Sequence, residues 1–221
     1  MKKYKVLNLY ACLGGNRYKW DEVAKAAEIN LEVTAVELDL ELARLYAERF
    51  PNDKVIVADA HKYLLGNLNF DYVWSSPPCP SHSRARFARH KTTKPAYPDL
   101  KLYEEIIFLD NYFKGKYVVE NVIPYYEPLI PAKKRGRHLY WTNFNLPNDL
   151  NERKSSIMES KNEVQKWCEF HKYDFYKYKG KQRIDKIARN LVDYEAGKTI
   201  LETAVGITRK QNVSQTELFN N

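Results

Sequence analysis

Alternating strand and helix patterns in the first 120 residues constrain the fold of this chain more than any other feature. Short apolar runs that read as strands lie at 4–10, 32–38, 54–59, 70–76 and 116–122. Stretches between them carry apolar residues at helical spacing, at 17–29, 40–50 and 100–113, the last with Asp99 as the expected N-cap. This order predicts a parallel α/β sheet, in which the ends of neighbouring strands share one edge.

Composition limits the class of protein and its compartment. The 221 residues suffice for one domain with a small appendage. Cys12, Cys79 and Cys168 are spaced too irregularly for a disulfide framework or a zinc site, so we expect no metal and a reducing compartment, the cytoplasm of a bacterium or phage-infected host. No long apolar run is present, so we expect no membrane span or signal peptide.

The composition of the sequence changes after the fifth expected strand. We divide the chain into a catalytic and cofactor-binding core, a small variable region that is polar and tyrosine-rich, a helical segment that returns to the core, and a flexible tail. These parts cover residues 1–142, 143–181, 182–208 and 209–221. We expect a monomer whose net charge of +8 favours a polyanionic partner such as nucleic acid.

The ends of the first three strands have the residues of a nucleoside site. The first strand runs into "NLYACLGGNR", a glycine-containing turn that lets a ligand approach the backbone closely. Glu37 ends the second strand, where an acid can bind ribose hydroxyls, and Asp59 ends the third. The glycine spacing differs from the dinucleotide fingerprint, so a cofactor without pyrophosphate, such as S-adenosylmethionine, fits better.

The fourth and fifth strands end in a thiol and a carboxyl. Cys79 follows Pro77 and Pro78, whose rings fix φ and stiffen the turn, and Glu120 lies near the end of the fifth strand. In a parallel sheet the two side chains would face one cleft. We expect the basic residues around the thiol, which are Arg84, Arg86, and Arg135 or Arg137, to lower its pKa.

A thiolate and a nearby acid suit methylation of a pyrimidine. Carbon 5 of cytosine is too electron-poor to attack a methyl sulfonium directly. Addition of a thiolate at carbon 6, with protonation of ring nitrogen 3 by the acid, makes carbon 5 nucleophilic. Loss of the carbon-5 proton after methyl transfer expels the thiol.

Four motifs in a fixed order over residues 6–141 resemble those of the DNA cytosine-5 methyltransferases. "NLYACLGGNR" resembles their first motif, Asp-Leu-Phe-x-Gly-x-Gly-Gly, and "SSPPCP" their Pro-Cys motif. "VVENV" and "RGRHLYW" resemble the Glu-Asn-Val and Arg-x-Arg motifs, and the short chain looks most like small phage and prophage members. The resemblance implies a Rossmann-like class I S-adenosylmethionine-dependent fold with a reduced target-recognition appendage, and DNA methylation with or without a restriction partner.

The resemblance also implies roles for individual residues. Cys79 would be the covalent nucleophile and Glu120 the acid at ring nitrogen 3, while Arg137 with Arg135 would hold the cytosine carbonyl and the phosphate backbone. Contacts to the cofactor would come from Tyr10, Leu13, Gly14, Gly15, Glu37, Asp59, Ala60, Pro78 and, in a degenerate closing motif, Asn190.

The chain departs from the family pattern in the first motif. Cys12 replaces a glycine, so either the turn tolerates a side chain or cofactor affinity suffers. Asn8 replaces the usual aspartate, which puts little in doubt.

A basic segment follows the thiol and predicts contact with DNA. Its cations, Arg84, Arg86, Arg89 and Lys91, surround Phe87, a combination suited to holding phosphates and wedging open a duplex while a base is extruded. The plainer interpretation is a solvated loop. His82 could assist proton removal, although a loop or phosphate contact is the simpler interpretation.

Other functions stay open at this point. A transfer-RNA cytosine-5 methyltransferase would share the chemistry, and a catalytically weak DNA-binding relative would explain Cys12. An amino-group methyltransferase is disfavoured because Cys79 stands where such enzymes carry an aromatic residue. The tail segment "QTELF" (Gln215 to Phe219) resembles the pentapeptide by which bacterial replication proteins bind the sliding clamp.

Overall fold

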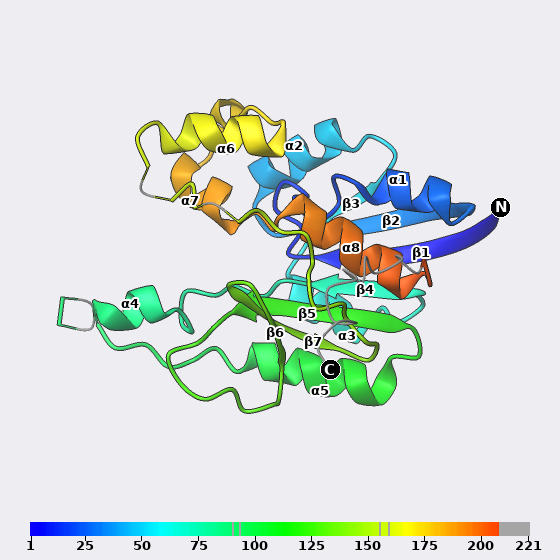
Figure 1. The fold of residues 1–221 in the computed structure, drawn as a ribbon, viewed down its shortest axis with the longest axis horizontal. Helices are drawn as coiled ribbons and strands as arrows, with labels where there is room; N and C mark the ends of the chain where they lie inside the picture. The colour runs from blue at the N-terminus through cyan, green and yellow to red at the C-terminus, as the bar shows by residue number, and fades with distance from the viewer. Residues whose placement is uncertain (90, 93, 155, 159, 208–221) are drawn as a thin grey trace, which may run out of the picture.

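A sheet with strand order β3-β2-β1-β4-β5-β7-β6 forms the centre of the molecule, seen here in a computed structural model (Figure 1). Strands β1 to β5 are parallel, whereas β7 pairs antiparallel with both β5 and β6. The parallel α/β sheet predicted from the sequence is confirmed. The strands are β1 (Lys2–Leu9), β2 (Ile29–Glu37), β3 (Lys54–Val57), β4 (Tyr72–Ser75), β5 (Lys116–Val122), β6 (Lys133–Arg135) and β7 (His138–Thr142).

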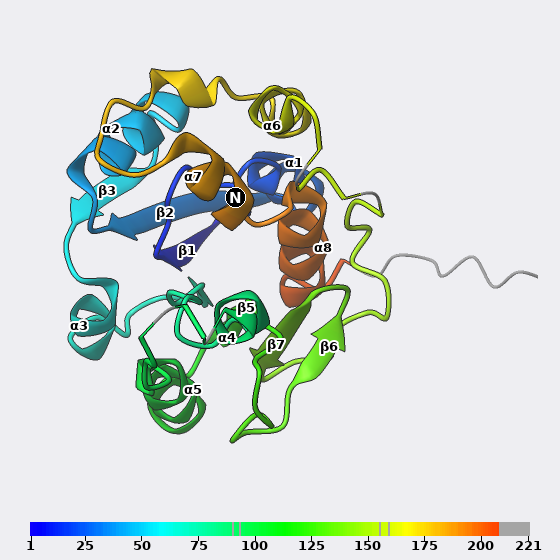
Figure 2. The same ribbon diagram turned by 90° about the vertical axis from the view of Figure 1, so that its left-hand side faces the viewer.

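Helices cover both faces of this sheet, as Figure 2 shows. One face carries α1 (Trp20–Ala26), α2 (Leu40–Arg49) and α8 (Tyr194–Ala204), and the other carries α3 (Ala60–Leu65) and α5 (Lys101–Tyr112). The remaining helices are α4 (Arg84–Ala88), α6 (Glu163–His171), α7 (Ile184–Asn190) and the 3-10 turn η1 (Phe175–Lys177). None of the helices in the described part of the chain combines the length and apolar character needed to cross a bilayer.

The structure describes residues 1–89, 91–92, 94–154, 156–158 and 160–207. The clamp-like pentapeptide at 215–219 and the tail at 209–221 lie outside this part of the chain.

The alternation of side chains along β1 builds the two apolar layers. Val6 belongs to a core cluster with Trp20 of α1 and Ile200 of α8. Its neighbour Leu7 points to the opposite face and joins a cluster with Leu109 of α5. Both strand residues are fully buried, which fixes the register of the central strand.

The switch point of the sheet lies between β1 and β4. Strand order runs from β1 to β2 on one side and from β1 to β4 on the other, so the helices that follow β1 and β4 lie on opposite faces. Ligands of open α/β sheets bind outside the carboxyl ends of the strands at such a point. In Figure 1 these ends face the side where α4 and α7 lie.

Some helix boundaries differ from the sequence prediction. The helix expected at 17–29 is wrong at both ends, because it covers Trp20–Ala26 and the chain turns at Glu28, whose φ is +53°. The N-cap of α5 is Leu100 and not Asp99, although the Asp99 carboxylate accepts a hydrogen bond from the Lys101 amide at 3.2 Å. Helix α3 was not expected, since six residues are too few for a helical period.

The variable region at 143–181 packs mainly on the α2 side of the sheet. Trp167 of α6 and Phe175 of η1 lie in one buried cluster with Leu45 of α2 and Ile187 of α7. Arg49 joins the turn after β1 to the end of α6, because its guanidinium donates to the carbonyl oxygens of Leu13 and His171, each at 2.8 Å.

Helix α8 approaches the turn after β1 so closely that only glycine fits at position 197. A Cβ added to Gly197 would lie 2.2 Å from the backbone oxygen of Asn16, and the Trp20 indole donates to the Gly197 carbonyl at 3.1 Å. We expect Gly197→Ala to lower the free energy of unfolding by about 1–3 kcal/mol, because the helix must shift. Urea unfolding measures the change. Gly66→Ala is the matched control, since no atom lies within 4 Å there, and an equal loss in both variants would contradict the packing argument.

Candidate active site

A cavity of about 1130 Å³ opens at the carboxyl edge of the sheet, beside the switch point. It is lined by the ends of β1, β2, β4 and β5, by the start of β7 and by α7. The cavity brings together ten of the residues predicted for catalysis and cofactor binding, which are Tyr10, Gly15, Glu37, Asp59, Ala60, Pro78, Cys79, Glu120, Arg137 and Asn190.

Other predicted residues lie outside this cavity. Leu13 is fully buried in the cluster of α2 and α7, and Gly14 faces the Phe50 ring with a φ of +67°. Arg135 donates to the carbonyl oxygen of Pro147 at 2.6 Å and lines a smaller neighbouring cavity. The remaining four, on α4 and the turn after it, do not line the cavity and are exposed: Arg84, Arg86, Arg89 and Lys91.

Hydrogen bonds between loops hold the Pro-Cys turn against the end of β5. The buried side-chain amide of Asn121 donates to the Pro77 carbonyl at 3.0 Å. The Tyr125 amide donates to the His82 carbonyl at 3.1 Å, and Arg84 Nε donates to the Pro124 carbonyl at 2.9 Å. Since these bonds continue beyond the last β4–β5 ladder pair, the turn that carries the thiol is fixed relative to the strand that carries Glu120.

The pKa of Cys79 is raised, so the expectation of a lowered value is wrong. Burial is the largest cause, and the neighbouring Glu120 carboxylate adds to it, while Lys186 of α7 acts in the opposite direction. The arginines do not offset these effects because their guanidinium groups are directed elsewhere, Arg84 to the Pro124 carbonyl and Arg137 to Met158. At neutral pH the thiol is therefore protonated.

Glu120 faces a histidine that the sequence reasoning did not assign. His138 Nε2 lies 3.5 Å from Glu120 Oε1, and His138 Nδ1 lies 3.7 Å from Glu152 Oε1. Burial lowers the pKa of His138, but the two carboxylates outweigh burial and raise it above its usual value. The cavity thus contains an acid–base pair beside the thiol. His138 stands in the quoted "RGRHLYW", whereas Glu152 lies in a coil that carries no sequence signal.

His82 also lines the cavity, three residues after the thiol in the same loop, and its amide donates to the Cys79 carbonyl at 3.0 Å. Its ring is buried, with Nδ1 2.6 Å from the Tyr126 hydroxyl, and Nε2 has no hydrogen-bond partner among the described residues. Burial lowers the pKa of His82, so the ring is neutral at physiological pH.

The acids at the ends of β2 and β3 fit a nucleoside cofactor. Glu37 accepts hydrogen bonds from the Cys12 amide at 2.8 Å and the Asp39 amide at 2.9 Å, one on each carboxylate oxygen. Each oxygen keeps a second acceptor position, which suits the two hydroxyls of a ribose. Burial raises the pKa of Glu37, while Asp59 caps α3 through the Lys62 amide, and that bond lowers its pKa.

Cys12 occupies a backbone conformation that glycine usually adopts. Its φ is +47°, and the turn is closed by a hydrogen bond from the Gly14 amide to the Ala11 carbonyl at 2.8 Å. The turn after β1 therefore forms with a side chain at this position, which answers one of the two possibilities raised by the sequence.

A buried carboxyl under the first motif was also missed. Glu105 of α5 accepts hydrogen bonds from the hydroxyls of Tyr10 at 2.5 Å and Ser75 at 2.6 Å, and it lies 3.1 Å from His61 Nδ1. The available signal was a charged residue on the apolar face of the expected helix, three positions after Leu102. This network fixes the Tyr10 side chain beside the cavity.

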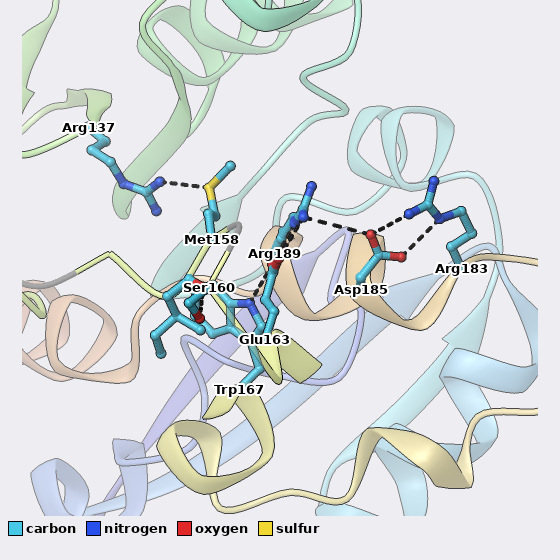
Figure 3. A network of polar contacts seen from close by, with 9 residues as sticks. Arg137, Met158, Ser160, Glu163, Trp167, Arg183, Asp185 and Arg189 are labelled. Atoms are coloured by element: carbon cyan, nitrogen blue, oxygen red, sulfur yellow. Dashed lines mark hydrogen bonds and ion pairs between the residues drawn. The ribbon is translucent and has the colours of Figure 1, made fainter. Parts of the chain in front are cut away.

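Figure 3 shows the contacts on the α6 and α7 side of the cavity. Arg137 Nη1 lies 3.2 Å from Met158 Sδ, and a thioether is a weak acceptor, so the exposed guanidinium remains available to a stronger one. Arg189 donates two hydrogen bonds of 2.6 Å to Glu163, which joins α7 to α6 next to Asn190.

Comparisons with solved structures show the fold. The chain is similar to a mutant of Spodoptera frugiperda DNMT2, with a TM-score of 0.50 and 14% identity over 90% of this chain and 98% of that one. It is also similar to the Entamoeba histolytica methyltransferase EhMeth (TM-score 0.44, 15% identity, 71% of this chain and 59% of that one). A third is a putative DNA modification methyltransferase of an Escherichia coli prophage (TM-score 0.36, 19% identity, 56% and 34%). This chain thus spans less than two thirds of the last two proteins.

The predicted fold class is confirmed. The chain has the Rossmann-like fold of S-adenosylmethionine-dependent methyltransferases. No family model matches the sequence, and no curated protein is significantly similar to it.

The raised pKa of Cys79 predicts slow alkylation at neutral pH and a rate that still increases above about pH 9. Glu120→Gln removes the carboxylate that stabilises the protonated thiol, so we expect alkylation of Cys79 at pH 8 to become about two- to tenfold faster. Peptide mass spectrometry after iodoacetamide treatment measures the rate, with Cys168 as the internal reference. A slower or unchanged rate would show that Glu120 does not control the thiol.

Proposed function

We propose that this protein transfers a methyl group from S-adenosylmethionine to carbon 5 of cytosine in DNA through a covalent adduct on Cys79. One observation carries the proposal. Cys79, in the turn after β4, and Glu120, near the end of β5, line the same cavity as Glu37 and Asp59 at the switch point of a methyltransferase fold.

Cys79 and Glu120 perform the first step together. The Cys79 thiol releases its proton to solvent water as the base enters, and the sulfur forms a bond to carbon 6 of the cytosine. The electrons of the carbon 5–carbon 6 double bond move to carbon 5 while Glu120 donates a proton to ring nitrogen 3. The Pro-Cys turn and the Asn121 contact to Pro77 restrict the sulfur, which favours attack by orientation.

Residues at the other end of the cavity would hold the cofactor. Glu37 would bind the ribose hydroxyls and Asp59 the adenine amino group, with Tyr10, Gly15 and Asn190 nearby. The cofactor supplies an electrophilic methyl group when bound. Carbon 5 forms a bond to this methyl group and then loses its proton to solvent water. The electrons of the broken C–H bond restore the double bond, the sulfur of Cys79 leaves carbon 6, and ring nitrogen 3 returns its proton to Glu120.

The segment after the thiol supports a nucleic-acid substrate. Arg86 and Lys91 are exposed on α4 and the turn beyond it, which project from the body of the molecule in Figure 1. Phe87 stacks on Tyr125 with ring centroids 4.6 Å apart and an angle of 4° between the planes. Cations beside an aromatic pair suit a segment that holds phosphates and supports an extruded base.

Several finer predictions accompany this proposal. A small phage or prophage origin, a monomeric state, a role in restriction–modification and a clamp contact through 215–219 stay predictions from the sequence. Transfer RNA is the alternative substrate, because the chemistry at Cys79 would be the same.

A covalent trap tests the chemistry directly. DNA that contains 5-fluorocytosine lacks the carbon-5 proton, so the adduct on Cys79 cannot be released after methyl transfer. With S-adenosylmethionine we expect a protein–DNA complex that survives denaturing electrophoresis, no complex with Cys79→Ser, and adduct formation about 10²- to 10⁴-fold slower with Glu120→Gln.

The other outcomes of this experiment separate the alternatives. Methyl incorporation without a trapped complex would favour transfer to an amino group and would refute the covalent mechanism. A complex with fluorinated transfer RNA but not with DNA would assign the activity to RNA. Cys12→Ser is the control for a second thiol in the cavity and should still form the complex.

Salt dependence tests the basic segment. If Arg86 and Lys91 contact phosphates, the double variant Arg86→Ser/Lys91→Ser should bind DNA more weakly and lower the slope of log K against log salt by about 2, since each contact contributes about 0.9. Fluorescence anisotropy over a range of salt concentrations measures the slope. The charge-matched control is Lys2→Ser/Lys25→Ser, with Lys2 at the start of β1 and Lys25 in α1, away from the carboxyl ends of the strands. An equal effect of this control would show that only net charge matters.

A further inference from the structure

His138 is placed beside Glu120 by the pairing of β5 with β7. Glu120 pairs with Tyr140 and Val122 pairs with His138, so the side chains of Glu120 and His138 are diagonal neighbours on one face of the sheet. The distance between Glu120 Oε1 and His138 Nε2 is 3.5 Å. Glu120 is 7% exposed, so its route to solvent runs past its neighbours in the cavity.

The other ring nitrogen faces a second carboxyl. His138 Nδ1 lies 3.7 Å from Glu152 Oε1 and has no hydrogen-bond partner among the described residues. The Tyr140 hydroxyl donates to the same Glu152 oxygen at 3.1 Å and positions it. Glu152 therefore continues the line from Glu120 through the imidazole.

Glu152 also connects two cavities. It lines the main cavity and a smaller one of about 370 Å³, bordered by Arg135, Asp149 and Lys154. The row Glu120, His138 and Glu152 thus leads from the buried acid to a second opening at the surface.

The charged groups around His138 favour its protonated form. The carboxylates of Glu120 and Glu152 raise the pKa of His138 against the effects of burial and of Arg137. Arg135, opposite His138 in the β6–β7 pair, directs its guanidinium to the Pro147 and Leu146 carbonyls. The pair of Glu120 and His138 therefore retains a proton at pH values where an isolated carboxyl has lost it.

We propose that Glu120, His138 and Glu152 form a proton-transfer chain that supplies Glu120 with the proton it donates to the base. This inference rests on the proposed cytosine methylation. His138 acts through Glu120 and is a positioning residue. The separations of 3.5 and 3.7 Å exceed ordinary hydrogen bonds, so the ring is not locked to either carboxylate, and such contacts commonly shorten when substrate binds.

The protons that move along this row are balanced by exchange with water at its far end. When ring nitrogen 3 takes the proton of Glu120, His138 Nε2 passes its proton to the resulting carboxylate and becomes neutral. The neutral ring keeps its Nδ1 proton. When the base gives its proton back through Glu120, Nε2 takes it up, and an excess proton leaves from Nδ1 to Glu152, which exchanges with water in the smaller cavity. No redox partner is needed, because only N–H and O–H bonds form and break.

A pH profile separates this role from a structural one. We expect His138→Gln to form the 5-fluorocytosine adduct about 10- to 100-fold more slowly than the wild type at pH 8, with a much smaller loss at pH 6, because without His138 the proton must come from solvent, whose proton concentration rises as the pH falls. Dividing the variant rate by the wild-type rate at each pH removes the pH dependence of the Cys79 thiol, which both proteins share.

Glu152→Gln provides a second test that keeps His138 in place, in case His138→Gln fails to fold. Removing the carboxylate should lower the pKa of His138, so the loss of activity at high pH should begin at a lower pH. Labelled-histidine NMR measures the same pKa without turnover, with His138→Gln to assign the signal. Glu104→Gln is the matched control, since Glu104 lies 3.2 Å from His61 and should leave the profile unchanged.

The outcomes distinguish the two proposals. If wild-type protein forms the adduct but the His138→Gln ratio is equal at pH 6 and pH 8, the proton chain is wrong and the methylation proposal stands. An unchanged His138 pKa in Glu152→Gln likewise overturns the chain. If the wild type forms no adduct with DNA or RNA, the proposed function fails, and the chain fails with it.

Discussion

The hydrogen bond from the Asn121 amide to the Pro77 carbonyl is the contact on which the site depends. The β4–β5 ladder ends at Ser75 and Val119, and the thiol lies four residues beyond it. Without a further link, a turn of that length would be free to move, prolines notwithstanding. The buried 3.0 Å bond carries the alignment of the two strands past the end of the sheet, so Cys79 keeps its place beside Glu120.

The short distance between Cys79 and Glu120 also determines the electrostatics of the cavity. Burial and the neighbouring Glu120 carboxylate raise the pKa of Cys79, which keeps the sulfur protonated at neutral pH. A raised thiol pKa protects the residue from alkylation and oxidation, and it makes activation depend on groups that arrive or move on binding. Lys186 and Arg137 are cations that line the same cavity.

The site residues at the strand ends could be predicted from the sequence because each reactive side chain follows an apolar run with the length of a strand. Cys79, Glu120, Glu37 and Asp59 follow apolar runs, and parallel strands bring their ends to one edge by necessity. Two kinds of feature could not be predicted. His138 and Glu120 meet through antiparallel pairing, whose register no local pattern specifies. The direction of the Cys79 pKa shift depended on where guanidinium groups point, which their sequence proximity does not reveal.

The turn at Cys12 keeps its contact with β2 although cysteine replaces a glycine of the first motif. A side chain at φ +47° costs about 1 kcal/mol or more, the reason glycine is usual there. In this conformation the Cys12 amide donates to Glu37 Oε2 at 2.8 Å, and a hydrogen bond to a charged group contributes about 1.5–3 kcal/mol. The contact with β2 can therefore offset the strain. What the site requires is the direction of one N–H group, and glycine is only the least costly way to obtain it.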